Sequence, residues 1–175
     1  LSQAEHDEAA YPLLVCVSEG MARRVEAALE EQLASLPRAT IARASLVANG
    51  FAFVVGSRER MAEVADAIAA EHLSLQVENA DALLEHITHA GAAFVGGLTP
   101  EAAGDYLAGP SHVLPTGGAV RFGAPLGVYD FVTRTSVIRY SREALAAHAP
   151  AITRFARLEG LEAHARAVEV RLRGH

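Results

Sequence analysis

Apolar positions in the first hundred residues occur in two patterns: short continuous runs, and a recurrence every three or four residues. Short runs rich in β-branched and aromatic residues are typical of strands, and the longer recurrence is typical of helices with one buried face. Strands separated by helices at this rhythm predict an α/β fold, a mostly parallel, Rossmann-like but incomplete sheet with flanking helices on both faces. The predicted strands span 11–17, 51–55 (buried), 73–77 and 92–95.

Serine, glycine and proline mark the ends of the predicted helices. Ser18, Ser57 and Ser141 each precede a helical recurrence and can accept a bond from a backbone N–H of the first turn. Pro37 ends the first helix. Further helices are predicted over 40–47, over 79–89, and from Thr99-Pro100 onward, where proline suits a helix start.

After Arg134 the pattern changes. A last strand is predicted over 135–140 and helices over 141–149, from Pro150 to about 158, and over 161–172. Pro150 either starts the second of these helices or kinks it. We therefore expect an α/β domain portion at 1–134 and a helical tail at 135–175.

The composition argues against two classes of protein, those that bind nucleic acids and those that span membranes. The chain has 175 residues, 51% of them apolar, which is enough for a sizeable core. Its net charge of −6 argues against a nucleic-acid partner, and no apolar run approaches the ~20 residues of a membrane span. The single cysteine, Cys16, suits a reducing compartment. We expect a cytoplasmic protein with no nucleic-acid and no membrane partner.

The most distinctive segment is PEAAGDYLAGPSHVLPTGGAVRF, residues 100–122, which places Asp105 and His112 on either side of a Gly-Pro turn. Three further segments share its irregular character: LSQAEHD at the start, AAEHLSLQ around residue 72, and LEGLEAHARAV near the end. In this order, the four segments resemble the histidinol dehydrogenase family from Leu1 to about Leu172. The resemblance is to the C-terminal portion of the family's chain, which implies further sequence upstream.

Local spacing alone does not show a metal site. Gln3 and His6 would share one face of a helix, but the chain has no compact Cys/His cluster. The resemblance implies one zinc ion, and it also implies that the zinc ligands contact the substrate. The implied zinc ligands are Gln3, His6, Asp105 and His164.

Glu71 and His72 form a second candidate constellation. An isolated Glu-His pair is typical of a helix end, where the helix dipole stabilises the histidine. The resemblance implies acid/base roles instead: His72 contacts the substrate and accepts the proton of the alcohol, and Glu71 activates the water that attacks the aldehyde. Ala70 departs from the family pattern, in which proline usually precedes this pair.

Two more residues are implied to bind the substrate, His112 after the Gly-Pro turn and Glu159 in the tail. In the family the C-terminal tail crosses to the partner subunit. The resemblance therefore implies a homodimer in which Glu159 and His164 complete the neighbouring active site.

No Gly-x-Gly-x-x-Gly segment follows a predicted strand, and Thr116-Gly117-Gly118 lacks the context of a phosphate cradle. The resemblance implies NAD as a cofactor, bound mostly by residues upstream of Leu1, so this chain alone is expected to be inactive. The implied reaction is oxidation of L-histidinol, through the aldehyde, to L-histidine. Two alternatives stay open: a related zinc/NAD dehydrogenase acting on another alcohol, and a non-catalytic zinc-binding or dimerisation fragment.

Overall fold

All strand pairs of the structure, a computed structural model describing residues 1–173, are parallel. Strand β1 (Leu13–Cys16) pairs with β2 (Phe51–Val54), and β3 (His72–Leu75) pairs with β4 (Ala92–Val95). The described residues therefore form two short parallel sheets. The predicted α/β class is confirmed, although the strands assemble in two pairs.

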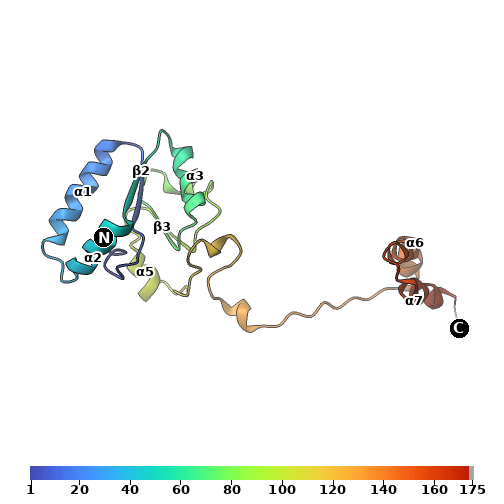
Figure 1. Cartoon of the computed structure of the whole chain (residues 1–175). Coiled ribbons are helices and arrows are strands. Elements are labelled where there is room, and N and C mark those ends of the chain that lie inside the picture. The colour runs from blue at the N-terminus through green and yellow to red at the C-terminus, as the bar shows by residue number, and fades with distance from the viewer. Residues whose placement is uncertain (174–175) are drawn as a thin grey trace. The chain divides into compact units, whose positions relative to one another are not determined.

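The chain divides into two units, one from Leu1 to Phe131 and one that begins at Val132. In the first unit, α1 and α2 lie on one side of the strands and α3 lies on the other (Figure 1). The predicted caps are confirmed: Ser18 Oγ accepts from the N–H of Met21 at 3.2 Å, and Ser57 Oγ accepts from that of Arg60 at 3.3 Å. The elements are α1 (Glu19–Leu33), α2 (Ala39–Asn49), α3 (Arg58–Ile68), α4 (Ala80–Leu84), α5 (Glu101–Tyr106) and the 3₁₀ turns η1 (Ala119–Arg121) and η2 (Val128–Phe131).

The beginnings of β3 and β4 approach each other closely at Gly91. A Cβ atom at this position would lie 2.6 Å from the carbonyl oxygen of Glu71, so only glycine fits. The N–H of Gly91 donates to the carbonyl of Ala70 at 2.9 Å, and the N–H of Ala92 donates to that of Glu71 at 2.8 Å. The backbone that carries Glu71 is therefore held on the sheet.

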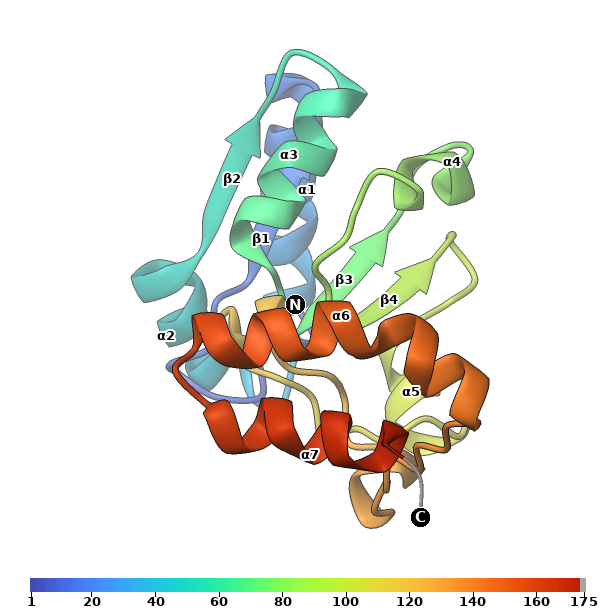
Figure 2. The same ribbon diagram turned by 90° about the vertical axis from the view of Figure 1, so that its right-hand side faces the viewer.

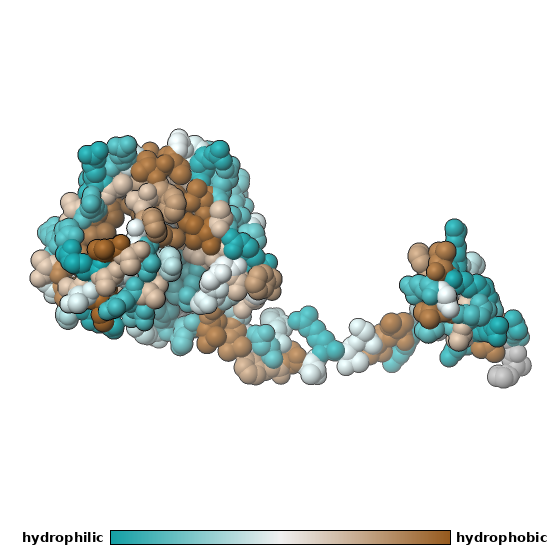
Figure 3. Space-filling model, viewed as in Figure 1, coloured by the Kyte–Doolittle hydropathy of each residue, from teal (hydrophilic) through white to brown (hydrophobic). Residues whose placement is uncertain are grey.

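Two predictions for this unit are wrong in part. Strand β2 forms as predicted, but all four of its residues are exposed, and Phe51 is 57% exposed. Among residues 1–173, β2 pairs only with β1, so its other edge has no strand partner. Figure 3 shows apolar surface in this region of the unit. Helix α4 ends at Leu84, not near 89, because the N–H groups of Thr88 and His89 donate to the carboxylate of Asp66.

The second unit is a helical hairpin. Helices α6 (Arg142–Leu158) and α7 (Glu162–Leu172) run side by side (Figure 2). Ser141 caps α6 as predicted, accepting from the N–H of Ala144 at 3.1 Å. Arg157 joins the two helices, since its guanidinium reaches Glu162 at 3.0 Å and Glu169 at 2.7 Å.

Pro150 lies inside α6, which is one helix across the position where two had been predicted. The prediction of a strand over 135–140 is wrong. These residues form neither helix nor strand, and within the described chain they have no strand partner. Alternating apolar residues become a strand only when a second strand accepts their hydrogen bonds.

No helix among residues 1–173 is long and apolar enough to cross a membrane.

Candidate functional site

A cavity of about 500 Å³ in the first unit gathers polar side chains from distant parts of the chain. Two come from the N-terminal segment, one from the residue before β3, one from the first residue of β3, three from α5 and one from the loop after α5. Six of these side chains were predicted as site residues: Gln3, His6, Glu71, His72, Asp105 and His112. The other lining residues are Ala10, Glu101 and Tyr106.

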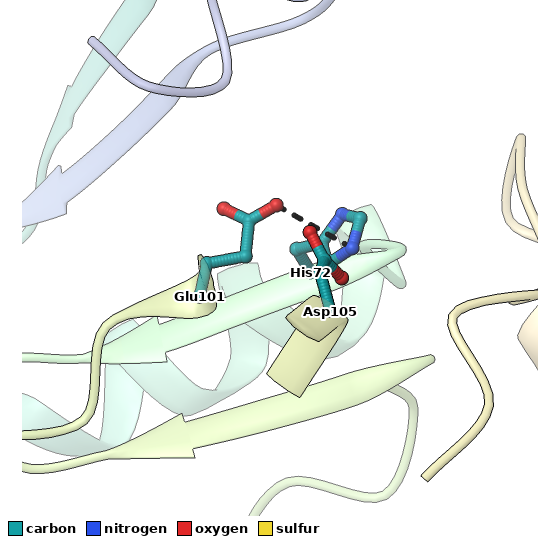
Figure 4. A group of neighbouring side chains, drawn as sticks. All are labelled: His72, Glu101 and Asp105. Atoms are coloured by element: carbon teal, nitrogen blue, oxygen red, sulfur yellow. Dashed lines mark ion pairs between the residues drawn. The ribbon is translucent and has the colours of Figure 1, made fainter. Parts of the chain in front are cut away.

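Three of the lining residues, His72, Glu101 and Asp105, form a cluster (Figure 4). One ligand atom of each lies within 4.8 Å of the others, and Nε2 of His72 lies 3.5 Å from Oε1 of Glu101. Helix α5 presents both carboxylates, because positions four apart share one helix face. The side chains of His72 and Glu101 are only 19% and 15% exposed, so their interaction is shielded from water.

Burial raises the pKa of Glu101 above its ordinary value, because the charged form loses its hydration. His72 and His6 oppose this shift, whereas the negative charges of Asp105 and Glu71 add to it. A carboxyl group whose pKa is raised, next to a histidine in a cavity, is typical of a site that moves protons.

The N-terminal segment contributes a candidate metal ligand, Gln3. Gln3 and His6 lie on a hydrogen-bonded turn, with the N–H of His6 donating to the carbonyl of Gln3 at 3.2 Å, and not on a helix. Nε2 of Gln3 is buried and has no hydrogen-bond partner among the described residues. Since rotation of an amide exchanges its nitrogen and oxygen, the same place can hold an oxygen acceptor.

The donors around the cavity fit a divalent cation. An amide oxygen, an imidazole nitrogen and a carboxylate oxygen are available from Gln3, His6 and Asp105. Such mixed nitrogen and oxygen donors suit zinc. The unpaired amide of Gln3 is also a group that a bound cation would satisfy.

Glu159 and His164 belong to the second unit. Glu159 follows the last turn of α6, where its N–H donates to the carbonyl of Phe155 at 3.1 Å, and His164 is exposed on α7. Their roles as substrate and metal contacts stay predictions.

Residues 1–172 match the sequence profile of the family described as histidinol dehydrogenase. The chain belongs to this family. It is 53% identical to histidinol dehydrogenase of Syntrophotalea carbinolica over 173 residues, and 47% identical to that of Bacillus subtilis over 173 residues. Both alignments cover 99% of this chain and 40% of the relative.

The fold agrees with a solved member of the histidinol dehydrogenase family. The crystal structure of the enzyme from Elizabethkingia anophelis superposes with a TM-score of 0.91 at 33% identity, covering 98% of this chain and 40% of that one. The resemblance inferred from the four segments is thereby confirmed. The chain spans about 40% of the length of the histidinol dehydrogenases that it matches.

A dinucleotide cradle is not formed by the described residues of this family member. Gly117 and Gly118 have positive φ angles of 58° and 78°, but they precede the short η1 turn and do not join a strand to a helix. The N-terminus of a full helix, which such cradles use to bind phosphate, is missing at this position.

Sequence reasoning missed Glu101 and Tyr106. Glu101 is the first residue of α5, where an acidic side chain is common because the helix dipole favours it. The available signal was the spacing to Asp105: a carboxylate four residues earlier had to share its helix face. Tyr106 is largely exposed and follows Asp105 directly, and its sequence context gave no signal.

Proposed function

We propose that this chain supplies the zinc, substrate and acid/base groups of a histidinol dehydrogenase. The reaction is oxidation of L-histidinol through L-histidinaldehyde to L-histidine, with NAD as hydride acceptor. One observation carries the proposal: in a member of this family, six side chains expected from separate segments line a single cavity.

Gln3, His6 and Asp105 would hold the zinc ion from one subunit, together with His164 of the partner subunit. When bound, the metal supplies a positive charge that fixes the imidazole and amino nitrogens of the substrate. The same protein residues lie beside the place that the substrate would occupy, so they contact it as well. His112, which lines the cavity from the loop after α5, would contact the substrate near its reacting carbon.

His72 and Glu71 would divide the proton transfers. His72 takes the hydroxyl proton while the first hydride leaves the carbon, which gives the aldehyde. Glu71 takes a proton from a water molecule as that water adds to the aldehyde carbon, and the second hydride then leaves to give the carboxylic acid. Each positioned acid or base typically contributes ~10²–10⁴-fold in rate.

Glu101 would assist His72. Its carboxylate lies 3.5 Å from Nε2 of His72, so it can orient the ring and stabilise the positive charge that His72 gains with the proton. NAD supplies the acceptor for both hydrides, one for each NAD molecule. In this proposal most contacts to the cofactor come from residues outside this chain.

The active unit would be a homodimer with shared sites. The helical tail, residues 135–175, would pack on the partner subunit and bring Glu159 to the charged amino group of its substrate. Phe155 and Leu158 on α6 are largely exposed, which favours a further surface packing against that helix. We place the enzyme in the cytoplasm, where Cys16, which is buried and free, would stay reduced.

The test is an assay of the protein at its full natural length with zinc, NAD and L-histidinol. The expected result is two NADH and one L-histidine for each histidinol consumed, and His72→Ala should abolish turnover. Faster oxidation of another alcohol would favour a related dehydrogenase. Absence of NADH formation with zinc and NAD present would favour a non-catalytic zinc-binding or dimerisation module.

A further inference from the structure

Three side chains, two on α2 and one just before it, hold the backbone of the segment that carries Gln3 and His6. Arg38, which precedes α2, donates to the carbonyl of His6 at 3.2 Å. Asn49 at the end of α2 donates to the carbonyl of Glu8 at 3.2 Å, and Ser45 donates to that of Ala10 at 3.0 Å. Every second carbonyl from 6 to 10 is thus bound by a side chain.

The three donors lie on the same side of α2 as a buried alanine, Ala42. Arg38, Ala42, Ser45 and Asn49 follow a spacing of four, three and four residues, which places them along one side of a helix. We call this stripe the 38/42/45/49 face. Ala42 and Ala4 are both fully buried in the same apolar cluster, together with Leu33.

Ala4 stands between the two proposed zinc ligands in the sequence. Its burial fixes the turn from inside, while the three hydrogen bonds fix the chain that leaves the turn. Ser45 is the central contact, because its side chain is fully buried and its hydroxyl reaches the carbonyl of Ala10. This bond is costly to remove because the partly buried carbonyl of Ala10 then loses its partner.

The sheet in turn fixes α2. Only Gly50 separates α2 from β2, and the N–H of Phe51 donates to the carbonyl of Pro12 at 3.4 Å, where the N-terminal segment enters β1. The segment from Gln3 to Pro12 is therefore held both along α2 and at its junction with the paired strands.

We propose that the 38/42/45/49 face is a brace that holds Gln3 and His6 in position for the metal and thereby sets the zinc affinity, with Ser45 as its main positioning residue. The proposal rests on the proposed zinc site. Its physical basis is preorganisation: a ligand segment that is already ordered loses less conformational entropy when the ion binds. None of the four residues of this face lines the cavity, so their effect on the ion is indirect.

The experiment measures zinc affinity by competition with a chelator, on the protein at its full natural length. The test variants are Ser45→Ala and Asn49→Asp, each of which removes one donor. Ser35→Ala is the matched control, because Ser35 lies just after α1 and its exposed hydroxyl donates to the carbonyl of Gln32 and not to the N-terminal segment. We expect the dissociation constant for zinc to rise about tenfold in both test variants, as for other groups that orient metal ligands, and to stay unchanged in the control.

Two further readouts separate this role from a loss of overall stability and from failure of the zinc site. The free energy of unfolding of the metal-free variants should change less than the free energy of zinc binding. Exchange of the Glu5 and His6 amide protons should accelerate in Ser45→Ala. If Ser45→Ala does not fold, the zinc affinity of Asn49→Asp tests the brace. Asn49 is only partly buried at the end of α2, so its substitution disturbs folding less.

Unchanged zinc affinity and amide exchange in the folded test variants would overturn the brace, even if His6→Ala loses the ion. If the unaltered protein binds no zinc, the proposed function fails instead, and amide exchange in the metal-free protein still tests whether α2 orders the turn.

Discussion

Nε2 of His72 and Oε1 of Glu101 lie 3.5 Å apart in a cavity where both side chains are less than one-fifth exposed. One comes from the start of β3 and the other from the first turn of α5, so the tertiary fold brings them together. Burial raises the pKa of Glu101, and the approach of His72 opposes that shift. His72 therefore influences the charge of Glu101, as expected of a pair that handles a proton.

Glu101→Gln should slow histidinol oxidation. The change removes a negative charge beside His72 while keeping the size of the side chain. The charge that His72 gains would lie 3.5 Å from the Glu101 carboxylate, shielded from water. A loss of about 1.4 kcal/mol of this attraction already lowers kcat tenfold, so kcat should fall about tenfold or more. Steady-state kinetics of the full-length protein measure this, with Glu85→Gln on the exposed end of α4 as the control. Equal rates for Glu101→Gln and the unaltered protein would contradict a role for Glu101.

Metal content should separate two possible ligand sets. The atoms of His72, Glu101 and Asp105 lie close enough to hold an ion, whereas the proposed zinc set shares only Asp105 with this cluster. We expect Asp105→Ala and His6→Ala to lose zinc, and His72→Ala to retain it while losing activity. His86→Ala, an exposed histidine outside the cavity, serves as the control. Loss of zinc from His72→Ala with retention in His6→Ala would assign the ion to the His72 cluster.

Glu71→Gln should affect the second half of the reaction more than the first. Alcohol oxidation requires only a base for the hydroxyl proton, whereas aldehyde oxidation also requires an activated water. Loss of a general base typically costs ~10²–10⁴-fold in rate. The two half-reactions can be followed separately by supplying L-histidinol or L-histidinaldehyde. Equal losses in both would refute the division of roles between Glu71 and His72.

Shared active sites predict complementation between inactive subunits. Glu71→Gln damages the cavity of its own subunit, and His164→Ala damages the site that its tail completes in the partner. A heterodimer of the two contains one site with both defects and one site with neither. Mixing should therefore recover activity, up to about half for fully formed heterodimers, by the symmetry of a closed dimer. Verified heterodimers with no recovery would argue that each subunit completes its own site.

The sequence predicted the features that depend on near neighbours. Ser18, Ser57 and Ser141 cap helices because each hydroxyl reaches an N–H only three residues away. The exposure of β2 and the missing strand at 135–140 depend instead on which segments lie alongside, and local pattern carries no information on that. Helix α4 ends early for the same reason, since Asp66 on α3 takes the N–H groups that a longer helix would use.

The candidate site also depends on tertiary packing that local sequence pattern does not predict. Spacing alone gave no reason to place Gln3 and His6 beside Asp105, because tertiary packing against α1 and α2 positions the turn that carries them. The family resemblance supplied that juxtaposition. Glu101 was missed because its place at a helix start has an ordinary explanation in the helix dipole.

Asp66 should make the stability of the first unit depend on pH in the acid range. Its Oδ1 accepts from the N–H groups of Thr88 at 2.8 Å and His89 at 2.9 Å, and its Oδ2 accepts from Oγ1 of Thr88 at 2.7 Å. Burial alone would raise the pKa of Asp66, but these bonds and the nearby His89 imidazole outweigh it, and the pKa lies below the ordinary 3.8. The folded state therefore favours the ionised form. The resulting stabilisation is present above pH 3.8 and is lost as the pH falls through the lower folded-state value.

The measurement is urea unfolding of the unaltered protein and of Asp66→Asn, which does not titrate, from neutral pH into the acid range. Near neutral pH the unaltered protein should be more stable by about 1–2 kcal/mol, the worth of hydrogen bonds to a charged acceptor at a partly exposed site. Below pH 3.8 the difference should shrink, because protonated Asp66 no longer accepts all three bonds. Asp81→Asn on α4, whose side chain is exposed, controls for the loss of one negative charge. A stability difference that stays constant through the acid range would show that Asp66 does not fasten the Thr88–His89 turn through its charge.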